Sequence, residues 1–305
     1  MSSSEILCVG EVLWDALPEG LFLGGAPFNV ACHLRAAGTP VSMVSRVGSD
    51  RLGQEALRRA ARYGVGVDLV QVDDTLPTGF VSIAVDDAGI PTYEIVAPAA
   101  WDAIGVSDAL LARAAKARAI VFGSLAQRHA TSRHTIERLL DTKALKVFDV
   151  NLRPPFEDRE VVRRSFHRAD VVKLSDAEMR RVADWFDLRS SPHDAAAGLA
   201  ETFGCSVVCI THGSNGAALW RDGRWSEHPG FTVEVKDTVG AGDAFLAVLL
   251  VGLLAGGDDA MLLQNANLIG AYVATQFGAL PTDQTVATPP VSPPTAKRPR
   301  RGRRG

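Results

Sequence analysis

The sequence contains no run of eighteen or more apolar residues, and this absence excludes a transmembrane helix. Residues 1–5 lack the basic segment followed by an apolar one that marks a secretory signal, so we expect a cytoplasmic protein. The seven histidines and four cysteines also lack the spacing of metal ligands, and no C-x-x-C pair occurs. This favours buried or reduced thiols over a zinc site at Cys8, Cys32, Cys205 and Cys209.

Hydrophobic residues make up 47% of the 305 residues, which is enough for one large α/β domain or two small ones. The net charge is −3, but residues 297–305 carry six positive charges, and subtracting these leaves −9 on the rest. We expect residues 1–283 to form the folded domain and residues 284–305 to be a disordered basic tail. Such a tail can bind nucleic acid. A solvated tail without a dedicated role is the more frequent case, so we expect no nucleic-acid partner. The sequence is compatible with either a monomer or a homodimer.

Beyond residue 100 the pattern alternates between strand and helix, which predicts a mostly parallel sheet with helices on both faces. Before this region, strands are predicted at 5–10 and 41–47, and helices at 29–37 and 50–63. Further helices are predicted at 107–116, 130–140, 157–167, 175–186 and 193–203, and strands at 118–122, 145–149, 169–173 and 206–211, with a hairpin turn at 222–223.

Three segments do not fit this alternation of strands and helices. Residues 11–23 look irregular or like an edge strand, and residues 79–85 and 90–96 read as a hairpin joined by residues 86–89. Together they predict a small β sheet apart from the main one. We expect it to form a lid built from about residues 11–24 and 76–100.

A glycine turn at 237–243, Asp-Thr-Val-Gly-Ala-Gly-Asp, follows a predicted strand at 231–235 and precedes an apolar, uncapped helix at 244–255. Gly240 and Gly242 allow a sharp turn and a close approach to a ligand. The free N–H groups and positive dipole end of the helix make an anion site, typically for phosphate. Asp243 has two interpretations: an acid that complements the helix dipole, or a general base beside a phosphoryl group.

Five ordered motifs carry a family resemblance: Gly24-Gly25-x-Pro27-x-Asn29-x-Ala31 with Gly38 and Gly48, then residues 149–155, 173–178, 211–216 and 237–243. Over about residues 5–282 the chain resembles the PfkB (ribokinase-like) carbohydrate kinases, most closely fructokinases. The resemblance implies a ribokinase-like α/β fold and transfer of the γ-phosphoryl of ATP to a primary hydroxyl, with fructose favoured. A ribokinase- or nucleoside-kinase-like acceptor, or a non-catalytic sugar- or nucleotide-binding protein, remains an alternative.

The resemblance also implies residue roles. Asp243 would be the base, and the amides of Gly240, Ala241 and Gly242 the anion hole. The remaining roles are sugar binding by Asp15, Gly24, Gly25, Asn29 and Arg153; nucleotide binding by Thr211, Gly213, Gly216 and Ser175; Mg²⁺ binding through water by Glu178; and binding of a monovalent cation, K⁺, by Asp237.

Some of these residues have complete structural interpretations as well. Ser175 and Glu178 have the spacing of a helix capping box. Arg153 could hold its own turn instead of an anion, and Asp15 could be a solvated turn residue. Phe28 stands where the family commonly has a small residue, so we expect it to reshape the sugar pocket.

Overall fold

A computed structural model describes residues 5–17, 20–85, 91–189 and 191–280. The chain divides into two compact units, Met1–Val172 and Lys173–Gly305. The expected tail at 284–305 and the expected hairpin turn at 86–89 lie outside the described residues. No helix in the described part of the chain has both the length and the apolar character needed to cross a membrane.

The main sheet of the first unit is parallel, because every strand in it returns through a helical crossover. Its central strands are fully buried, as predicted for apolar runs covered on both faces. In spatial order the strands are β9 (Leu145–Asp149), β8 (Ala119–Gly123), β1 (Ile6–Val9), β4 (Val41–Gly48) and β5 (Val70–Asp73). The helices are α1 (Ala26–Ala36), α2 (Arg51–Arg62), α3 (Asp108–Ala114), α4 (Ala130–Leu139) and α5 (Arg159–Arg168), with short 3₁₀ helices η1 (Ala100–Ala103) and η2 (Leu125–Gln127).

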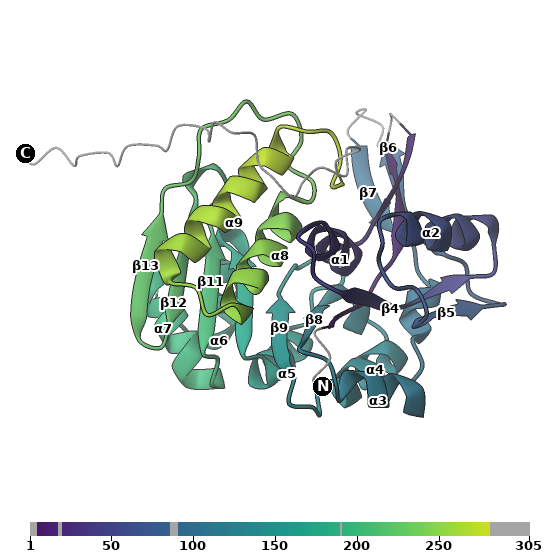
Figure 1. Ribbon diagram of the computed structural model, residues 1–305, viewed down its shortest axis with the longest axis horizontal. Helices are drawn as coiled ribbons and strands as arrows, with labels where there is room; N and C mark the ends of the chain where they lie inside the picture. The colour runs from purple at the N-terminus through teal and green to yellow at the C-terminus, as the bar shows by residue number, and fades with distance from the viewer. Residues whose placement is uncertain (1–4, 18–19, 86–90, 190, 281–305) are drawn as a thin grey trace, which may run out of the picture. The chain divides into compact units, whose positions relative to one another are not determined.

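A separate four-stranded sheet also belongs to the first unit (Figure 1). Its spatial order is β3 (Gly20–Gly24), β2 (Leu13–Leu17), β6 (Gly79–Val85) and β7 (Pro91–Ile95). Strand β2 pairs antiparallel with β3 and parallel with β6, which pairs antiparallel with β7. The predicted small sheet is therefore confirmed, and of the two interpretations of residues 11–23 the edge strand holds, because β3 lies at the edge of this sheet and pairs with β2.

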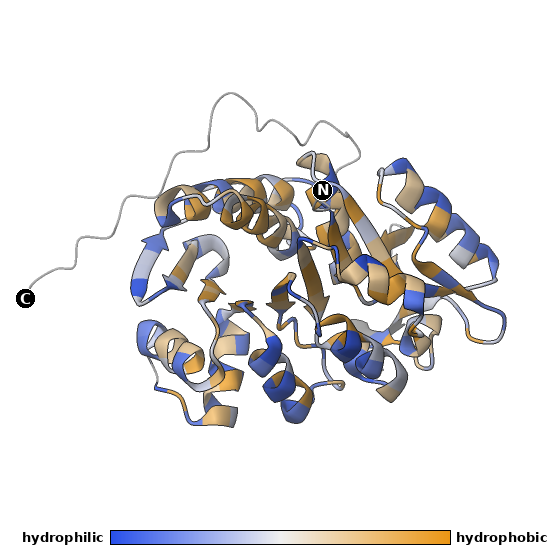
Figure 2. Ribbon diagram, turned by 60° about the horizontal axis from the view of Figure 1, so that its bottom comes forward, coloured by the Kyte–Doolittle hydropathy of each residue, from blue (hydrophilic) through white to orange (hydrophobic). Residues whose placement is uncertain are grey.

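The second unit begins within β10 (Val171–Ser175) and continues the βα pattern before ending in antiparallel strands. In Figures 1 and 2, helices α8 and α9 lie on one side of its strands and α6 and α7 on the other. The elements are α6 (Asp176–Phe186), α7 (Pro192–Phe203), β11 (Val207–Thr211), η3 (Gly213–Asn215), β12 (Ala217–Arg221), β13 (Arg224–His228), α8 (Ala241–Leu254) and α9 (Asp259–Ala274). The predicted α/β class, with a mostly parallel sheet, flanking helices and a smaller separate sheet, is confirmed.

The segment before the glycine turn corrects one prediction. Residues 231–235 form no strand; only Phe231 makes a single bridge. Gly230, at φ +75°, lies against Gly216 and donates its N–H to His228 Nδ1. This bend turns the chain away from the edge strand β13. The backbone of residues 231–235 therefore has no neighbouring strand to pair with, although their side chains alternate.

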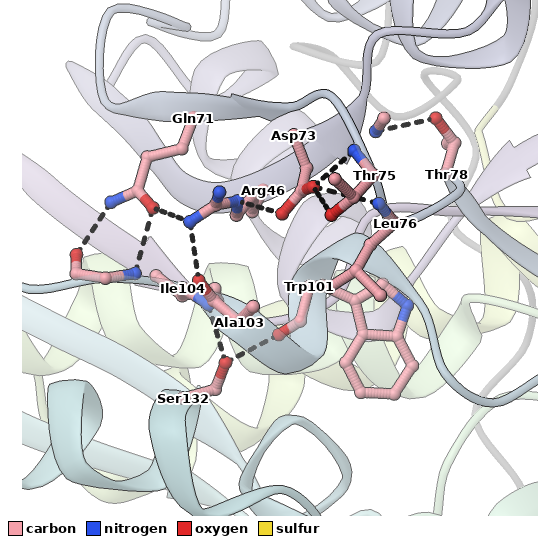
Figure 3. A network of polar contacts seen from close by, with 12 residues as sticks. Arg46, Gln71, Asp73, Thr75, Leu76, Thr78, Trp101, Ala103, Ile104 and Ser132 are labelled. Atoms are coloured by element: carbon pink, nitrogen blue, oxygen red, sulfur yellow. Dashed lines mark hydrogen bonds and ion pairs between the residues drawn. The ribbon is translucent and has the colours of Figure 1, made fainter.

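A polar network fixes the loop before β6 (Figure 3). Asp73, at the end of β5, accepts from the backbone N–H groups of Leu76 and Thr75, and these bonds lower its pKa to about 2. Its other carboxylate oxygen pairs with Arg46 Nε at 2.7 Å. Thr78, the last residue before β6, is held through its own N–H and hydroxyl by Asp50 at 2.8 and 2.7 Å. The small sheet therefore leaves the main sheet from a tightly bonded loop.

Candidate functional site

In the first unit, the hairpin β2–β3 places a carboxylate beside a glycine. The register sets Leu13 opposite Gly24 and Asp15 opposite Phe22. A Cβ added at Gly24 would lie 2.5 Å from Asp15 Oδ2, which no side chain could tolerate without displacing the carboxylate. Glycine at this position therefore leaves the Asp15 carboxylate its space.

The next glycine caps α1 and lies against the backbone carbonyl of Glu11. Gly25 has φ +108° and is the N-cap of α1, and an added Cβ would overlap the carbonyl oxygen of Glu11. Asn29 lies in the first turn and is buried, with its N–H bonded to Gly25 O at 2.9 Å. Glu11 is also buried, with its Cγ against this same position. Glu11 could not be selected from the sequence, because a carboxylate in a segment read as irregular is usually solvated.

Arg153 reaches the same place from the turn after β9. Desolvation raises the pKa of Asp15 to about 6, and the positive charge of Arg153 opposes this rise. The two residues, 138 positions apart in the chain, therefore interact electrostatically. Arg153 Nη1 also donates to Leu152 O at 2.9 Å, so the guanidinium supports its own turn as well. We call Asp15, Gly24, Gly25, Asn29 and Arg153 the carboxylate site.

Phe28, next to Asn29 in the sequence, belongs to the hydrophobic core. Its side chain is fully buried in the core, with its ring edge-on to Tyr63 at a centroid distance of 6.4 Å. It lies one residue before Asn29 on α1, and the helical rotation between the two directs its ring into the hydrophobic core.

The raised pKa of Asp15 predicts a cost in stability at neutral pH. The folded state holds this proton more tightly than the unfolded state, so stability falls as the pH rises from 3.8 through about 6. We expect Asp15→Asn to raise the free energy of unfolding by about 1–3 kcal/mol at pH 8 and to change it little at pH 4. Urea unfolding at both pH values measures this, with exposed Asp222→Asn as the control. An Asp15→Asn protein no more stable than wild type at pH 8 would contradict the prediction.

In the second unit, the glycine turn opens α8. Gly240 has φ +76° and is the N-cap, with no side chain capping the helix, so Ala241, Gly242 and Asp243 form the first turn. The Ala241 N–H donates weakly to Thr238 O at 3.3 Å. Within the described chain, no group accepts from the N–H groups of Gly240 and Gly242. A helix N-terminus with two open amides is suited to binding an anion.

A lysine lies behind this turn. Lys173, on β10, is buried, and its Nζ would be 3.2 Å from a Cβ added at Gly242. A larger residue at 242 would therefore push against the ammonium group as well as covering the amides. Lys173 lies in one of the five motifs, but the sequence analysis predicted no role for it. The feature that could have indicated a role is a basic residue inside an otherwise apolar strand.

Asp237 ties the glycine turn to the segment after α9. Its Oδ1 accepts from Val239 N at 3.0 Å and its Oδ2 from Gly278 N at 2.9 Å. No group of three or more His, Cys, Asp or Glu side chains that could hold a metal ion occurs among the described residues. Any cation here would need backbone carbonyls, water or ligand oxygens beside this one carboxylate.

A cavity of about 330 Å³ lies next to the turn, entirely within the second unit. Five expected residues line it: Thr211, Gly213, Gly216, Ala241 and Gly242. The sequence missed the rest of the wall, because residues 231–235 were assigned to a strand and α9 was not predicted. These further lining residues include Phe231, Val233, Val235, Phe245, Asn267 and Gly270. The wall is largely apolar and glycine-rich, as in a pocket for a flat, partly apolar ligand.

Ser175 and Glu178 form the capping box that their spacing predicted. Glu178 Oε2 accepts from Ser175 N at 2.7 Å and from Ser175 Oγ at 2.9 Å, while Glu178 N donates to Ser175 Oγ at 3.3 Å. Neither residue is among those lining the cavity. Nearby, Asp176 Oδ1 lies 2.7 Å from His212 Nδ1, so His212 is bonded rather than facing solvent as a free side chain.

Comparison with known proteins finds similarity over most of the chain. Residues 19–285 match the family described as "pfkB family carbohydrate kinase". The chain is 31% identical over 266 residues to a fructokinase of Rhizobium leguminosarum bv. trifolii, covering 81% of this chain and 79% of that one.

Solved structures of fructokinases have a similar fold. The fructokinase of Xylella fastidiosa with bound ATP superposes with a TM-score of 0.79 at 26% identity, covering 90% of this chain and 94% of that one. A double mutant of fructokinase from Vibrio cholerae O395, bound to fructose, ADP and a potassium ion, gives 0.76 at 25% identity, covering 91% and 94%.

Proposed function

Because the chain belongs to the pfkB family of carbohydrate kinases, which are sugar phosphotransferases, we propose that it transfers the γ-phosphoryl of MgATP to a primary hydroxyl of fructose. The start of α8 carries this proposal: its first turn has two open amides and the carboxylate of Asp243, and the buried ammonium group of Lys173 lies against Gly242 in the same turn. The fructokinase names of the relatives and the fructose bound to the Vibrio structure support the choice of sugar.

Phosphoryl transfer depends mainly on positioning and on charge stabilisation. The amides of Gly240 and Gly242 would donate to the oxygens of the transferred group, and Ala241 could join them by giving up its weak bond to Thr238 O. Lys173 would add positive charge beside Gly242. Asp243, in the first turn of α8, would take the proton of the attacking hydroxyl.

The cavity would hold the nucleotide. Thr211, Gly213 and Gly216 would face its phosphates, and the apolar wall its base. Gly213 has open space around its Cα, so a phosphate could approach its backbone closely. Ser175 would bind the nucleotide from the N-terminus of α6, where its side chain also caps the helix.

Magnesium would neutralise charge on the phosphates when bound. It commonly uses only one or two carboxylates plus phosphate oxygens and water, and Glu178 fits that requirement. Glu178 Oε2 accepts two bonds from Ser175, which hold the carboxylate at the start of α6, and we propose that it contacts the ion through water.

The carboxylate site of the first unit would hold the sugar. Asp15 and Asn29 would offer polar groups to the hydroxyls, Gly24 leaves the Asp15 carboxylate its space, and Arg153 supplies positive charge. Coupled measurement of ADP release tests the proposal across fructose, ribose, glucose, 2-keto-3-deoxygluconate and adenosine. We expect the highest kcat/KM with fructose. A higher kcat/KM with ribose or adenosine would show that this compound is the preferred acceptor. No ADP release with any of the five compounds would show that the chain is not a kinase for them.

We also expect K⁺ to raise the activity several-fold. Asp237 bridges the glycine turn and Gly278, so a cation beside it would order the anion-binding amides without touching the sugar. Initial rates in potassium chloride and tetramethylammonium chloride at equal ionic strength measure the effect, and Asp237→Asn should remove the difference. Equal rates of the wild-type protein in the two salts would contradict it.

A further inference from the structure

Arg128, the residue after η2, is a buried cation held on every side. Its side chain is 6% exposed. Nε and Nη2 donate to the two carboxylate oxygens of Asp102 at 2.7 and 2.8 Å, a bidentate pair. The guanidinium carbon lies 3.9 Å from the ring centre of Trp101 and 4.5 Å from that of Phe156. Only a planar guanidinium can both form the forked pair and stack between two rings.

One contact of Arg128 reaches the end of the small sheet. Nη2 also donates to Val96 O at 3.0 Å, directly after β7. Val96 N in turn donates to Phe80 O on β6 at 2.9 Å. Because β6 pairs with β2, the strand that carries Asp15, Arg128 holds the base of the sheet on which this carboxylate is placed.

The opposite contact of Arg128 reaches the turn that carries Arg153. Phe156 N donates to Arg153 O at 2.8 Å, which closes this turn on the residue stacked against Arg128. One guanidinium therefore contacts Phe156 in the turn that carries Arg153, and it reaches the strand of Asp15 indirectly, through Val96 and β6. Nη1 of Arg128 is buried without an acceptor in the described part of the chain, so Asp102, Val96 O and the two rings are the groups that stabilise the cation.

We propose that Arg128 is a positioning residue for the sugar: it fixes the turn of Arg153 relative to the sheet of Asp15, so that both charges meet one ligand. This inference rests on the proposed function. Arg128 touches no substrate itself. Its effect passes to the sugar through Phe156 and Arg153 on one side, and through Val96 and β6 on the other.

Phe156→Leu tests the first path, since leucine keeps apolar volume but loses the aromatic face. We expect the KM for fructose to rise about tenfold, equivalent to ~1.4 kcal/mol, with the KM for ATP and kcat nearly unchanged. Arg181→Met is the matched control, because it removes an arginine stacked on Trp185 at 5.3 Å in the second unit. It should leave the KM for fructose unchanged.

A double-mutant cycle separates positioning from general destabilisation. In an Arg153→Ala background, Phe156→Leu should raise the KM for fructose no further, because its effect acts through the missing guanidinium. Additive effects, or an Arg153→Ala protein with an unchanged KM for fructose, would overturn the inference while leaving the proposed kinase intact. A wild-type chain that phosphorylates no sugar would overturn both.

Arg128→Lys tests the residue directly. Lysine keeps the charge but cannot make the forked pair, so we expect the same rise in the KM for fructose and faster amide exchange at Val96. If this variant does not fold, the cycle through Phe156 still decides the question. A folded Arg128→Lys protein with wild-type KM for fructose would refute the proposal.

Discussion

Asp243→Asn is expected to lower kcat by about 10²–10⁴-fold, the usual effect of losing a general base. Asparagine has nearly the same shape but cannot take a proton from the sugar hydroxyl. Nucleotide binding should be nearly unchanged, because the amides of Gly240 and Gly242 and the cavity wall remain in place. Steady-state kinetics with MgATP and fructose measure kcat, and calorimetry measures the affinity for the nucleotide.

The same substitution decides between the two interpretations of Asp243. If the carboxylate only complements the dipole of α8, its loss costs about 0.3–1 kcal/mol of stability and does not slow the reaction. Asp258→Asn is the matched control, because Asp258 caps α9 in the same unit and asparagine caps equally well. An Asp243→Asn protein within a few-fold of the wild-type kcat would show that the dipole interpretation is sufficient.

Much of the fold could be predicted from the sequence because its elements are locally determined. The buried strands are short apolar runs, and helices such as α5 and α6 begin at Asp158 and Ser175, whose side chains bond the first-turn amides. The hairpin of β12 and β13 turns at Asp222 and Gly223, both with positive φ, as their sequence indicated.

The errors arose where tertiary contacts override local pattern. Residues 231–235 alternate like a strand, but the bend at Gly230 removes their partner, and they line a cavity instead. Helix α9 escaped prediction because it is apolar on most sides: Ile269 and Val273 form a buried cluster with Ala244 of α8, and Tyr272 packs against this cluster. A helix without a clear polar face has no periodic signal to detect.

The candidate site was predictable in its motifs but not in its neighbours. Glycine positions 24, 25, 240 and 242 were found because their spacing is distinctive, and the structure gives each a steric reason. The contact of Lys173 with Gly242 and the pairing of Asp15 with Arg153 could not be found, since each depends on segments distant in the chain. Sequence spacing identifies residues that bend the backbone, whereas side chains that meet across the fold leave no such pattern.

The raised pKa of Asp15 predicts that its carboxylate lowers stability at neutral pH, and sugar binding would explain its presence. An ionised carboxylate can accept two hydrogen bonds from adjacent hydroxyls, each contributing about 1.5–3 kcal/mol. We therefore expect Asp15→Ala to raise the KM for fructose by roughly ten- to a hundredfold, with the KM for ATP little changed. Because the pKa of Asp15 is about 6, the wild-type KM for fructose should also rise as the pH falls below 6.

Steady-state kinetics between pH 5 and 8 test both parts of this expectation. Asp74→Ala is the control, because Asp74 is an exposed carboxylate in the same unit, in the loop before β6. The Asp74→Ala protein should keep the wild-type KM and its pH dependence, whereas the Asp15→Ala protein should lose the rise below pH 6. If Asp15→Ala leaves the KM for fructose unchanged, the carboxylate does not bind the sugar, and the small sheet does not act as its lid.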